Sequence, residues 1–280
     1  MITELGMKFT SFNELVQRLF RMTGINFARN SRALGLTSGS EFRIFMSSMF
    51  PVDNGHALVR IGPNGDGGYV LPDDFEGINY CFSPGSDLLW EFEREIGDRF
   101  KIVSHICDSL DKKPENLGEL QVYNESWLGP FTSGKYTSLA DWIRSSIDIS
   151  KSGDWLLQID IEGAEYLSLL AVPEDILLRF RVIILEAHSL DALMNRFSFE
   201  EFLSPFFQRL MKDFDLVHLH GNNCCGLWEY EGIQYPRIAE FTWHRKDRRL
   251  TNPVATQVKT ELDFKNLPSK NDLIFERPNN

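Results

Sequence analysis

The chain has 280 residues, of which 42% are hydrophobic and 25% charged, a composition that excludes the disordered, fibrous and membrane-embedded classes of protein. A chain of this length is expected to bury roughly three quarters of its unfolded surface, enough for one large domain with appendages. The formal net charge of -11 argues against binding nucleic acid or anionic lipid, since both require clustered positive charge. No apolar run is long enough for a membrane span, and charged residues interrupt the start of the chain, so we expect a cytoplasmic protein.

Residues 1–55 are predicted to form a helical extension. Ser11 and Glu14 make a capping box, and apolar residues between Phe12 and Phe20 recur at the spacing of one buried helix face. A second amphipathic stretch, 41–49, precedes Pro51. The extension could cover a sheet face, or it could be a lid or the contact surface of a homodimer.

Residues 56–245 alternate between strand-length apolar runs and amphipathic helices, which predicts an α/β domain with a doubly wound sheet. Strands are predicted at 78–82, 101–106, 120–123, 155–160, 182–186, 216–220 and 238–244, and helices at 88–96, 138–147, 164–171 and 198–214. A loop rather than a helix separates the last two strands, so they should form an antiparallel hairpin on an otherwise parallel sheet. Residues 246–280 are expected to form a polar tail that wraps the domain.

The four cysteines are Cys81, Cys107, Cys224 and Cys225. They form no C-x-x-C pair, and the adjacent pair has poor geometry for a disulfide framework or a structural zinc site. We expect all four to be reduced.

The first two predicted strands indicate a bound nucleoside, because ligands of doubly wound sheets bind at the carboxyl ends of the strands. A turn containing Ser83, Gly85 and Asp87 follows the first strand. Asp108 follows the second at about the ~20-residue spacing of an acidic residue that holds ribose hydroxyls. NAD is disfavoured, because the turn lacks the G-x-G-x-x-G fingerprint that seats a pyrophosphate. S-adenosylmethionine, which has adenosine without phosphates, fits better.

Acidic and imidazole groups follow the later strands. Asp160 and Glu162 should share one face of their strand, while Glu165 lies in the first turn of the next helix and complements its dipole. Glu186 and His188 follow the fifth strand, and the sixth ends in 218–223, with two histidines and two asparagines. We expect these groups to converge on one rim of the sheet.

Four strings within residues 58–245 resemble the FkbM-type S-adenosylmethionine-dependent O-methyltransferases. They are D-I-E-G-A-E at 160–165, L-E-A-H at 185–188, H-G-N-N at 220–223 and G-D-G-G-Y-V at 65–70. The resemblance implies a seven-stranded, Rossmann-like class I methyltransferase fold that methylates an alcohol, frequently on a sugar, in capsule, lipopolysaccharide or natural-product biosynthesis. The family's cofactor turn usually carries more than one glycine, whereas 83–87 carries one. The expected cofactor contacts are Ser83, Gly85, Asp87, Asp108, Asp66, Gly67, Asp160 and Glu162.

Methylation of a hydroxyl requires removal of its proton, for which two routes are open. In one, His188 or His220 is the general base and Asp160 or Glu186 orients it. In the other, Asp160, His188 and His220 bind a divalent cation such as Mn, Fe or Mg.

The acceptor is expected to be a sugar or a nucleotide-linked sugar. The loop after the sixth strand has the amide and aromatic composition of a carbohydrate-facing surface, with candidate contacts Asn222, Asn223, Trp228 and Tyr230. The basic run at 244–249 could meet a nucleotide diphosphate. The alternative function is a non-catalytic binding or scaffold protein on a methyltransferase fold.

Overall fold

The structure is a computed structural model that describes residues 35–86, 89–109, 115–151 and 153–278. The helix predicted between Phe12 and Phe20 therefore lies outside the described residues, as does Asp87. No helix within the described ranges is both long and apolar enough to cross a membrane.

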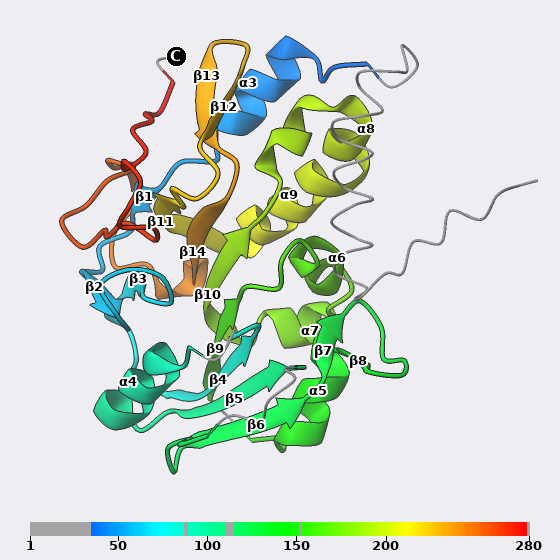
Figure 1. Cartoon of the computed structure of the whole chain (residues 1–280), viewed down its shortest axis with the longest axis vertical. Helices are drawn as coiled ribbons and strands as arrows, with labels where there is room; N and C mark the ends of the chain where they lie inside the picture. The colour runs from blue at the N-terminus through cyan, green and yellow to red at the C-terminus, as the bar shows by residue number, and fades with distance from the viewer. Residues whose placement is uncertain (1–34, 87–88, 110–114, 152, 279–280) are drawn as a thin grey trace, which may run out of the picture.

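A seven-stranded sheet forms the centre of the molecule, in the order β6-β5-β4-β9-β10-β14-β11 (Figure 1). Its strands are β4 (Ile78–Pro84), β5 (Val103–Asp108), β6 (Gln121–Glu125), β9 (Asp154–Ile159), β10 (Phe180–Ala187), β11 (Phe214–Gly221) and β14 (Ala239–Arg245). β4, β5, β6, β9 and β10 pair in parallel, whereas β14 is antiparallel to both β10 and β11. The predicted seven-stranded, mostly parallel α/β sheet and its antiparallel hairpin are confirmed, and this sheet is compatible with a Rossmann-like fold. Because β14 inserts between β10 and β11, β11 is the edge strand.

Helices and small sheets cover both faces of the central sheet. The helices are α3 (Gly39–Ser47), α4 (Glu91–Phe100), α5 (Leu139–Ser146), α6 (Glu165–Leu170), α7 (Glu174–Leu177), α8 (Arg196–Ser198) and α9 (Ser204–Asp213), with shorter 3₁₀ or π segments η2 (Leu190–Met194), η3 (Phe199–Leu203) and η4 (Lys246–Arg248). The small sheets pair β1 (Val52–Asp53) with β15 (Val254–Ala255), β2 (Leu58–Ile61) with β3 (Tyr69–Pro72), β7 (Trp127–Gly129) with β8 (Tyr136–Ser138), and β12 (Leu227–Tyr230) with β13 (Ile233–Pro236). Figure 1 shows α4 and the β2–β3 hairpin on one side of the central sheet and α5, α6, α7 and α9 on the other.

Burial on both faces explains the continuous apolar runs of the central strands. In β10, Val182 and Ile184 pack in the core beneath α4, while Ile183 and Leu185 pack in the larger core on the other face. Successive side chains of a strand point to opposite faces, so each strand contributes to both cores.

Side-chain caps set two of the helix starts. The hydroxyl of Ser138 accepts a hydrogen bond from the backbone N–H of Asp141 at 3.2 Å, so the predicted start of α5 is right. The long helix predicted to begin at Ser198 instead begins at α8, where the side chain of Asn195 accepts the N–H of Ser198 at 2.9 Å. The predicted start at Ser198 is wrong, because Asn195, one turn earlier, is at least as good a cap as a serine.

Candidate active site

One face of the central sheet changes from apolar to polar toward the carboxyl ends of its parallel strands. On the face beneath α4, the core residues of β9 and β10 are followed two positions later by Gln158 and Glu186. Glu240 of β14 pairs across the sheet with Glu186 on one side and with His220 on the other. All four side chains are buried, so the apolar core ends in a buried polar layer.

A cavity of about 350 Å³ opens at this polar layer. It lies where the strand order reverses, between β4 and β9, the position at which doubly wound sheets bind ligands. Its size falls within the roughly 300–1,000 Å³ range of small-molecule sites. The cavity brings together the predicted site residues Asp66, Gly67, Gly85, Asp160, Glu162, Glu186, His188 and Asn222.

A single buried carboxylate holds His188, which directly follows β10. Oε1 of Glu165 accepts the backbone N–H of His188 at 2.8 Å and lies 3.2 Å from its Nδ1. Oε2 of Glu165 accepts the N–H of Gly163 at 2.7 Å. Because this carboxylate can only accept, Nδ1 of His188 carries a proton and Nε2 is presented to the cavity. Such carboxylate–histidine pairs orient histidines in metal sites and in base catalysis.

Three carboxylates face Nε2 of His188. The atom lies 3.5 Å from Glu162, 3.8 Å from Glu186 and 3.9 Å from Asp160. Although burial opposes the imidazolium form, Glu165, Asp160 and Glu186 raise the pKa of His188 well above its usual range. Oδ1 of Asp160 is buried and has no hydrogen-bond partner among the described residues. A buried, unpartnered carboxylate oxygen is a ready acceptor for a ligand's cation or hydrogen-bond donor.

Three carboxyl groups of the pocket, those of Asp160, Glu186 and Glu93, retain protons unusually well. Burial, together with the charge of Glu186, holds the pKa of Asp160 well above its usual range. Burial also raises the pKa of Glu186 to about 8 and that of Glu93 to about 7. The described residues that line the cavity include no lysine or arginine. A bound cation would relieve the cost of ionising these groups, so the pocket favours positively charged ligands.

Asp160, Glu186 and His188 form a group that could hold a metal ion, since their ligand atoms all lie within 4.8 Å of one another. Two carboxylates and one imidazole suit Mn, Fe or Mg. His220, the third metal ligand predicted from the sequence, is not part of this group. It lies on β11, which β14 separates from β10, and Glu186 stands in its place.

His220 borders a different cavity, of about 870 Å³, between β11 and the segment that follows β15. Its Nδ1 lies 3.7 Å from Oδ1 of Asp263, and Nε2 of His218 lies 2.8 Å from the same oxygen. Burial lowers the pKa of His220. These two histidines therefore contact the C-terminal segment, and the structure does not bring His220 to the Asp160 group as a base.

Gly85 has a structural role that the sequence analysis did not foresee. Its φ is 81°, and a Cβ atom there would lie 1.6 Å from the backbone oxygen of Asp160. The missing side chain of Gly85 therefore makes no room for a ligand, because the space is filled by the backbone at the end of β9. Gly85 and Ser86 still border the cavity, so the turn forms part of its wall.

Asp108 ends β5 and contacts this same turn. Its carboxylate accepts the backbone N–H of Ser86 at 3.1 Å and that of Ser109 at 2.7 Å. It does not line the cavity as the structure describes it. Its predicted role in holding a ribose stays a prediction.

The Gly-rich string at 65–70 spans the loop between β2 and β3 and the start of β3, and its residues Asp66, Gly67 and Tyr69 line the cavity. Arg60 donates to backbone oxygens of this loop, including that of Gly65 at 2.7 Å. The amide of Asn266 donates to Asp66 at 3.2 Å and to Glu240 at 2.6 Å. Burial raises the pKa of Glu240 to about 8. Asn266 thus connects Asp66, in the wall of the cavity, to the C-terminal segment.

Of the four predicted acceptor contacts, only Asn222 lines the cavity, where its amide donates to Glu186 at 3.0 Å. Asn223 donates to a backbone oxygen of the C-terminal segment at 2.9 Å. Trp228 and Tyr230 donate to backbone oxygens of β13 and of the segment before α3, and their rings pack against α3. The two aromatic residues therefore anchor the β12–β13 hairpin and do not face the pocket.

Ser83, a predicted cofactor contact, does not line the cavity: it is fully buried, and its hydroxyl contacts the carboxyl group of Glu93 and the amide oxygen of Gln158. Glu93, Gln158 and Tyr69 do line the cavity and were not predicted from the sequence. The amide of Gln158 donates to the hydroxyl of Tyr69 at 2.9 Å. A signal was present for Glu93, which shares a helix face with Ile96, and for Gln158, a polar residue inside a buried strand. Polar groups at buried positions usually have a structural or functional reason.

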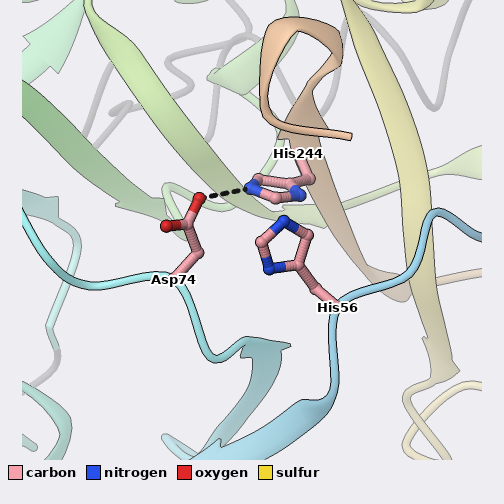
Figure 2. A group of neighbouring side chains, drawn as sticks. All are labelled: His56, Asp74 and His244. Carbon is pink, nitrogen blue, oxygen red and sulfur yellow. Dashed lines mark hydrogen bonds and ion pairs between the residues drawn. The ribbon is translucent and has the colours of Figure 1, made fainter. Parts of the chain in front are cut away.

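A second histidine–carboxylate group, His56, Asp74 and His244, lies where β14 reaches the amino end of β10 (Figure 2). Asp74 is 3.1 Å from Nε2 of His244 and forms ion pairs with Arg181 and Arg248. Although burial opposes it, these partners hold the pKa of Asp74 well below its usual range. Two guanidinium groups on one carboxylate exclude a metal ion by repulsion, so this group is structural.

Comparisons of this chain with protein-family models, with curated proteins and with solved structures find no match. The function is therefore inferred from the pocket and from the sheet that forms it.

Proposed function

We propose that this chain is an S-adenosylmethionine-dependent O-methyltransferase that acts on a hydroxyl of a sugar or a related polar small molecule. The observation that carries the proposal is the acidic pocket at the reversal point of the sheet, centred on Asp160, Glu186 and His188. Numbered in chain order, the seven strands of the sheet read 3-2-1-4-5-7-6. The first five follow the order of nucleotide-binding doubly wound sheets, which supports an adenosine-bearing ligand.

The charge of the pocket supports this cofactor over NAD. S-adenosylmethionine carries a positive sulfonium and an ammonium group, and it supplies a methyl group that an oxygen nucleophile can attack. Asp160 and Glu162 are the residues that we expect to hold these cationic groups, since Asp160 has a buried oxygen without a partner. Asp108 would hold the ribose from the end of β5. A pyrophosphate would instead meet carboxylates and no lysine or arginine among the described lining residues.

Glu186 is the residue that we propose to accept the acceptor's proton. Burial raises its pKa to about 8 in the ligand-free chain, so there it still holds a proton near neutral pH. The positive charge of a bound cofactor would lower this pKa toward the working pH and leave a carboxylate that can act as a general base. His188 has its pKa raised by the carboxylates around it, so near neutral pH it already carries its proton. Its role is then to position the carboxylates while Glu165 holds its Nδ1. Asn222, which donates to Glu186, orients that carboxyl group.

The acceptor is proposed to be a neutral sugar hydroxyl rather than a nucleotide-linked sugar. The basic run after β14 lies at the amino ends of the parallel strands, because β14 runs antiparallel to β10. Arg245, Arg248 and Arg249 each form an ion pair with an aspartate there. These guanidinium groups are thus engaged away from the pocket, where a diphosphate would require them.

Calorimetric titration of the full chain with S-adenosylmethionine tests the proposal. We expect saturable binding that is tighter than that of S-adenosylhomocysteine, which lacks the sulfonium charge, and we expect Asp160→Asn to reduce the difference. Methyl transfer would then be measured across neutral sugars and nucleotide sugars. Absence of both heat and a thermal shift at saturating cofactor would reject the proposal and leave a non-catalytic binding or scaffold protein.

A metal-dependent form of the reaction is the second candidate, and the grouping of Asp160, Glu186 and His188 favours it. A bound Mn, Fe or Mg ion would lower the pKa of the acceptor hydroxyl. Titration with Mn²⁺ should then give heat that Glu186→Gln and His188→Gln abolish. If activity survives exhaustive dialysis against EDTA, and elemental analysis detects no metal, the metal-independent route with Glu186 as base stands.

A further inference from the structure

Two adjacent thiols, Cys224 and Cys225, stand at the wall of the cavity in the loop between β11 and β12. Their sulfur atoms are 2.6 Å apart, and both thiols are free. Cys225 is exposed, whereas Cys224 is half-buried. The chain therefore presents one accessible thiol with a second thiol in contact behind it, the arrangement of an attacking and a resolving cysteine.

The backbone of Cys224 connects this pair to the site. Its N–H donates to Oδ1 of Asn222 at 2.9 Å, and its carbonyl oxygen accepts from Nζ of Lys270 at 2.5 Å. The amide of the same Asn222 donates to Glu186. Closing a disulfide between neighbouring residues changes the backbone torsions of Cys224, so it must disturb these contacts, which hold both the N–H and the carbonyl oxygen of that residue.

We propose that Cys224 and Cys225 are a redox modification site, at which a low-molecular-weight disulfide of the glutathione class forms a reversible disulfide between them. The Cys225 thiolate attacks the small disulfide, which forms a mixed disulfide and releases one small thiolate. The sulfur of Cys224 then attacks Cys225, displaces the second small thiolate and passes its proton to it. The net change oxidises two protein thiols to one disulfide and reduces one small disulfide to two thiols.

The geometry makes this disulfide easy to reduce. Neighbouring Cα atoms across a trans peptide are about 3.8 Å apart, below the ~4.4–6.8 Å range of ordinary disulfides. Such a bond is strained, and strained disulfides have more oxidising potentials. The inference agrees with the expected reduced state of the cysteines, since a labile disulfide forms only when the surroundings become oxidising. It does not depend on the proposed function.

Intact-mass analysis of the full chain after treatment with oxidised glutathione tests the proposal. We expect a loss of two hydrogen atoms, reversed by dithiothreitol, with the bond mapped between residues 224 and 225. Cys224→Ser should stop at the glutathione adduct, and Cys225→Ser should show no two-hydrogen loss. The buried pair offers matched controls, because Cys81→Ser and Cys107→Ser should oxidise as the parent does.

Hydrogen exchange provides a second readout, which does not require activity. Oxidation should increase exchange in the segment from Asn222 to Gly226, since the changed torsions of Cys224 displace its N–H from Asn222. A stable glutathione adduct on the parent chain, a two-hydrogen loss in Cys225→Ser, or no reaction at all would overturn the proposal. Unchanged exchange in this segment after the disulfide has formed would overturn its connection to Asn222.

Discussion

Glu165 combines three contacts of the site in one side chain. It accepts the N–H of Gly163 and the N–H of His188, and it lies 3.2 Å from Nδ1 of His188. The side chain is fully buried. A helix-start glutamate usually has only a weak interaction with the helix dipole, but here the carboxylate joins the start of α6 to the end of β10.

We predict that Glu165→Gln destabilises the fold and lowers the pKa of His188. The amide nitrogen of glutamine cannot accept the hydrogen bond that one carboxylate oxygen now accepts, and an unsatisfied buried donor costs about 1–3 kcal/mol. Removal of the negative charge also weakens the pull on the imidazole proton. Urea unfolding and NMR titration of the His188 ring measure the two effects.

The control for this variant is Glu174→Gln. Glu174 lies on α7 and pairs with Lys212 on the surface, where both side chains are largely exposed. Solvent screens exposed ion pairs, so this variant should change stability little and leave His188 unaffected. Equal losses in the two variants would show that the buried contacts of Glu165 have no special weight.

A second prediction at this scale concerns Asp108. If its carboxylate holds the cofactor ribose, Asp108→Ala should weaken S-adenosylmethionine binding by about 1.5–3 kcal/mol, the range for hydrogen bonds to a charged group. Asp98→Ala, an exposed change on α4, should leave the affinity unaltered. Calorimetry compares them, with thermal unfolding as a check that each variant is folded. Parent-like affinity in Asp108→Ala assigns the ribose to another residue.

At the level of the elements, the sequence was most informative where the hydrophobic period was unambiguous. All seven central strands could be predicted, because strands buried on both faces are continuous apolar runs. The antiparallel ending could be predicted because a loop, and no helix, connects the last two strands. The position of β14 between β10 and β11 could not be predicted, since it depends on long-range pairing. That single pairing places Glu240 beside Glu186 and moves His220 away from the predicted metal group.

Contacts between segments that are distant in the sequence could not be predicted from local sequence patterns either. Asn266 reaches Glu240 and Asp66 from the C-terminal segment, and nothing in its immediate sequence indicates this. The aromatic composition around Trp228 and Tyr230 suggested a sugar surface, yet the same residues satisfy the packing of a hairpin on α3. Composition alone does not distinguish a ring that binds a ligand from one that anchors a loop.

The close approach of β4 and β9 leads to a prediction about Gly85. Gly85→Ala would put a methyl group 1.6 Å from the backbone oxygen of Asp160, so the two strand ends must separate. We expect a loss of more than about 4 kcal/mol of unfolding free energy, typical of severe overpacking. Urea unfolding measures this loss.

Gly134→Ala separates backbone strain from overpacking. Gly134 also has a positive φ, but a Cβ atom there would have no neighbour within 4 Å. Its alanine variant should therefore lose only the strain of the left-handed conformation, about 1–2 kcal/mol. Similar losses at the two positions would mean that the approach of β4 to β9 is not the constraint.

Over the whole molecule, the buried acidic residues have different partners at the two ends of the central sheet. At the amino ends of the strands, Asp74, Asp154 and Asp215 each pair with an arginine. At the carboxyl ends, Glu186 and Glu240 are buried and keep raised pKa values of about 8. The ion pairs at the amino ends stabilise the fold. The buried glutamates at the carboxyl ends lower its stability, and a bound cation would relieve this cost.

This asymmetry predicts that the unfolding free energy of the ligand-free chain falls as the pH rises from about 6.5 to about 8. In that window unfolded glutamates are ionised, while Glu186 and Glu240 still bind protons in the folded state. Each such group lowers stability by up to about 1.4 kcal/mol per pH unit. Asp74, with a lowered pKa, loses its contribution only in acid, below the unfolded value of about 3.9.

Three histidines do not oppose the effect in this window, and His188, whose pKa is raised, adds a loss of stability in the same direction. The pKa values of His105, His220 and His244 are lowered, mainly by burial, so these groups raise stability with pH only up to about 6.5, their unfolded value. Urea unfolding at the two ends of the window measures the slope. Glu186→Gln and Glu240→Gln should each flatten it, whereas the exposed Glu261→Gln should not. If the unfolding free energy of the parent chain stays constant or rises across this window, the acids at the carboxyl ends are already ionised and stabilised by their neighbours. The raised pKa values would then no longer support a preference of the pocket for cations.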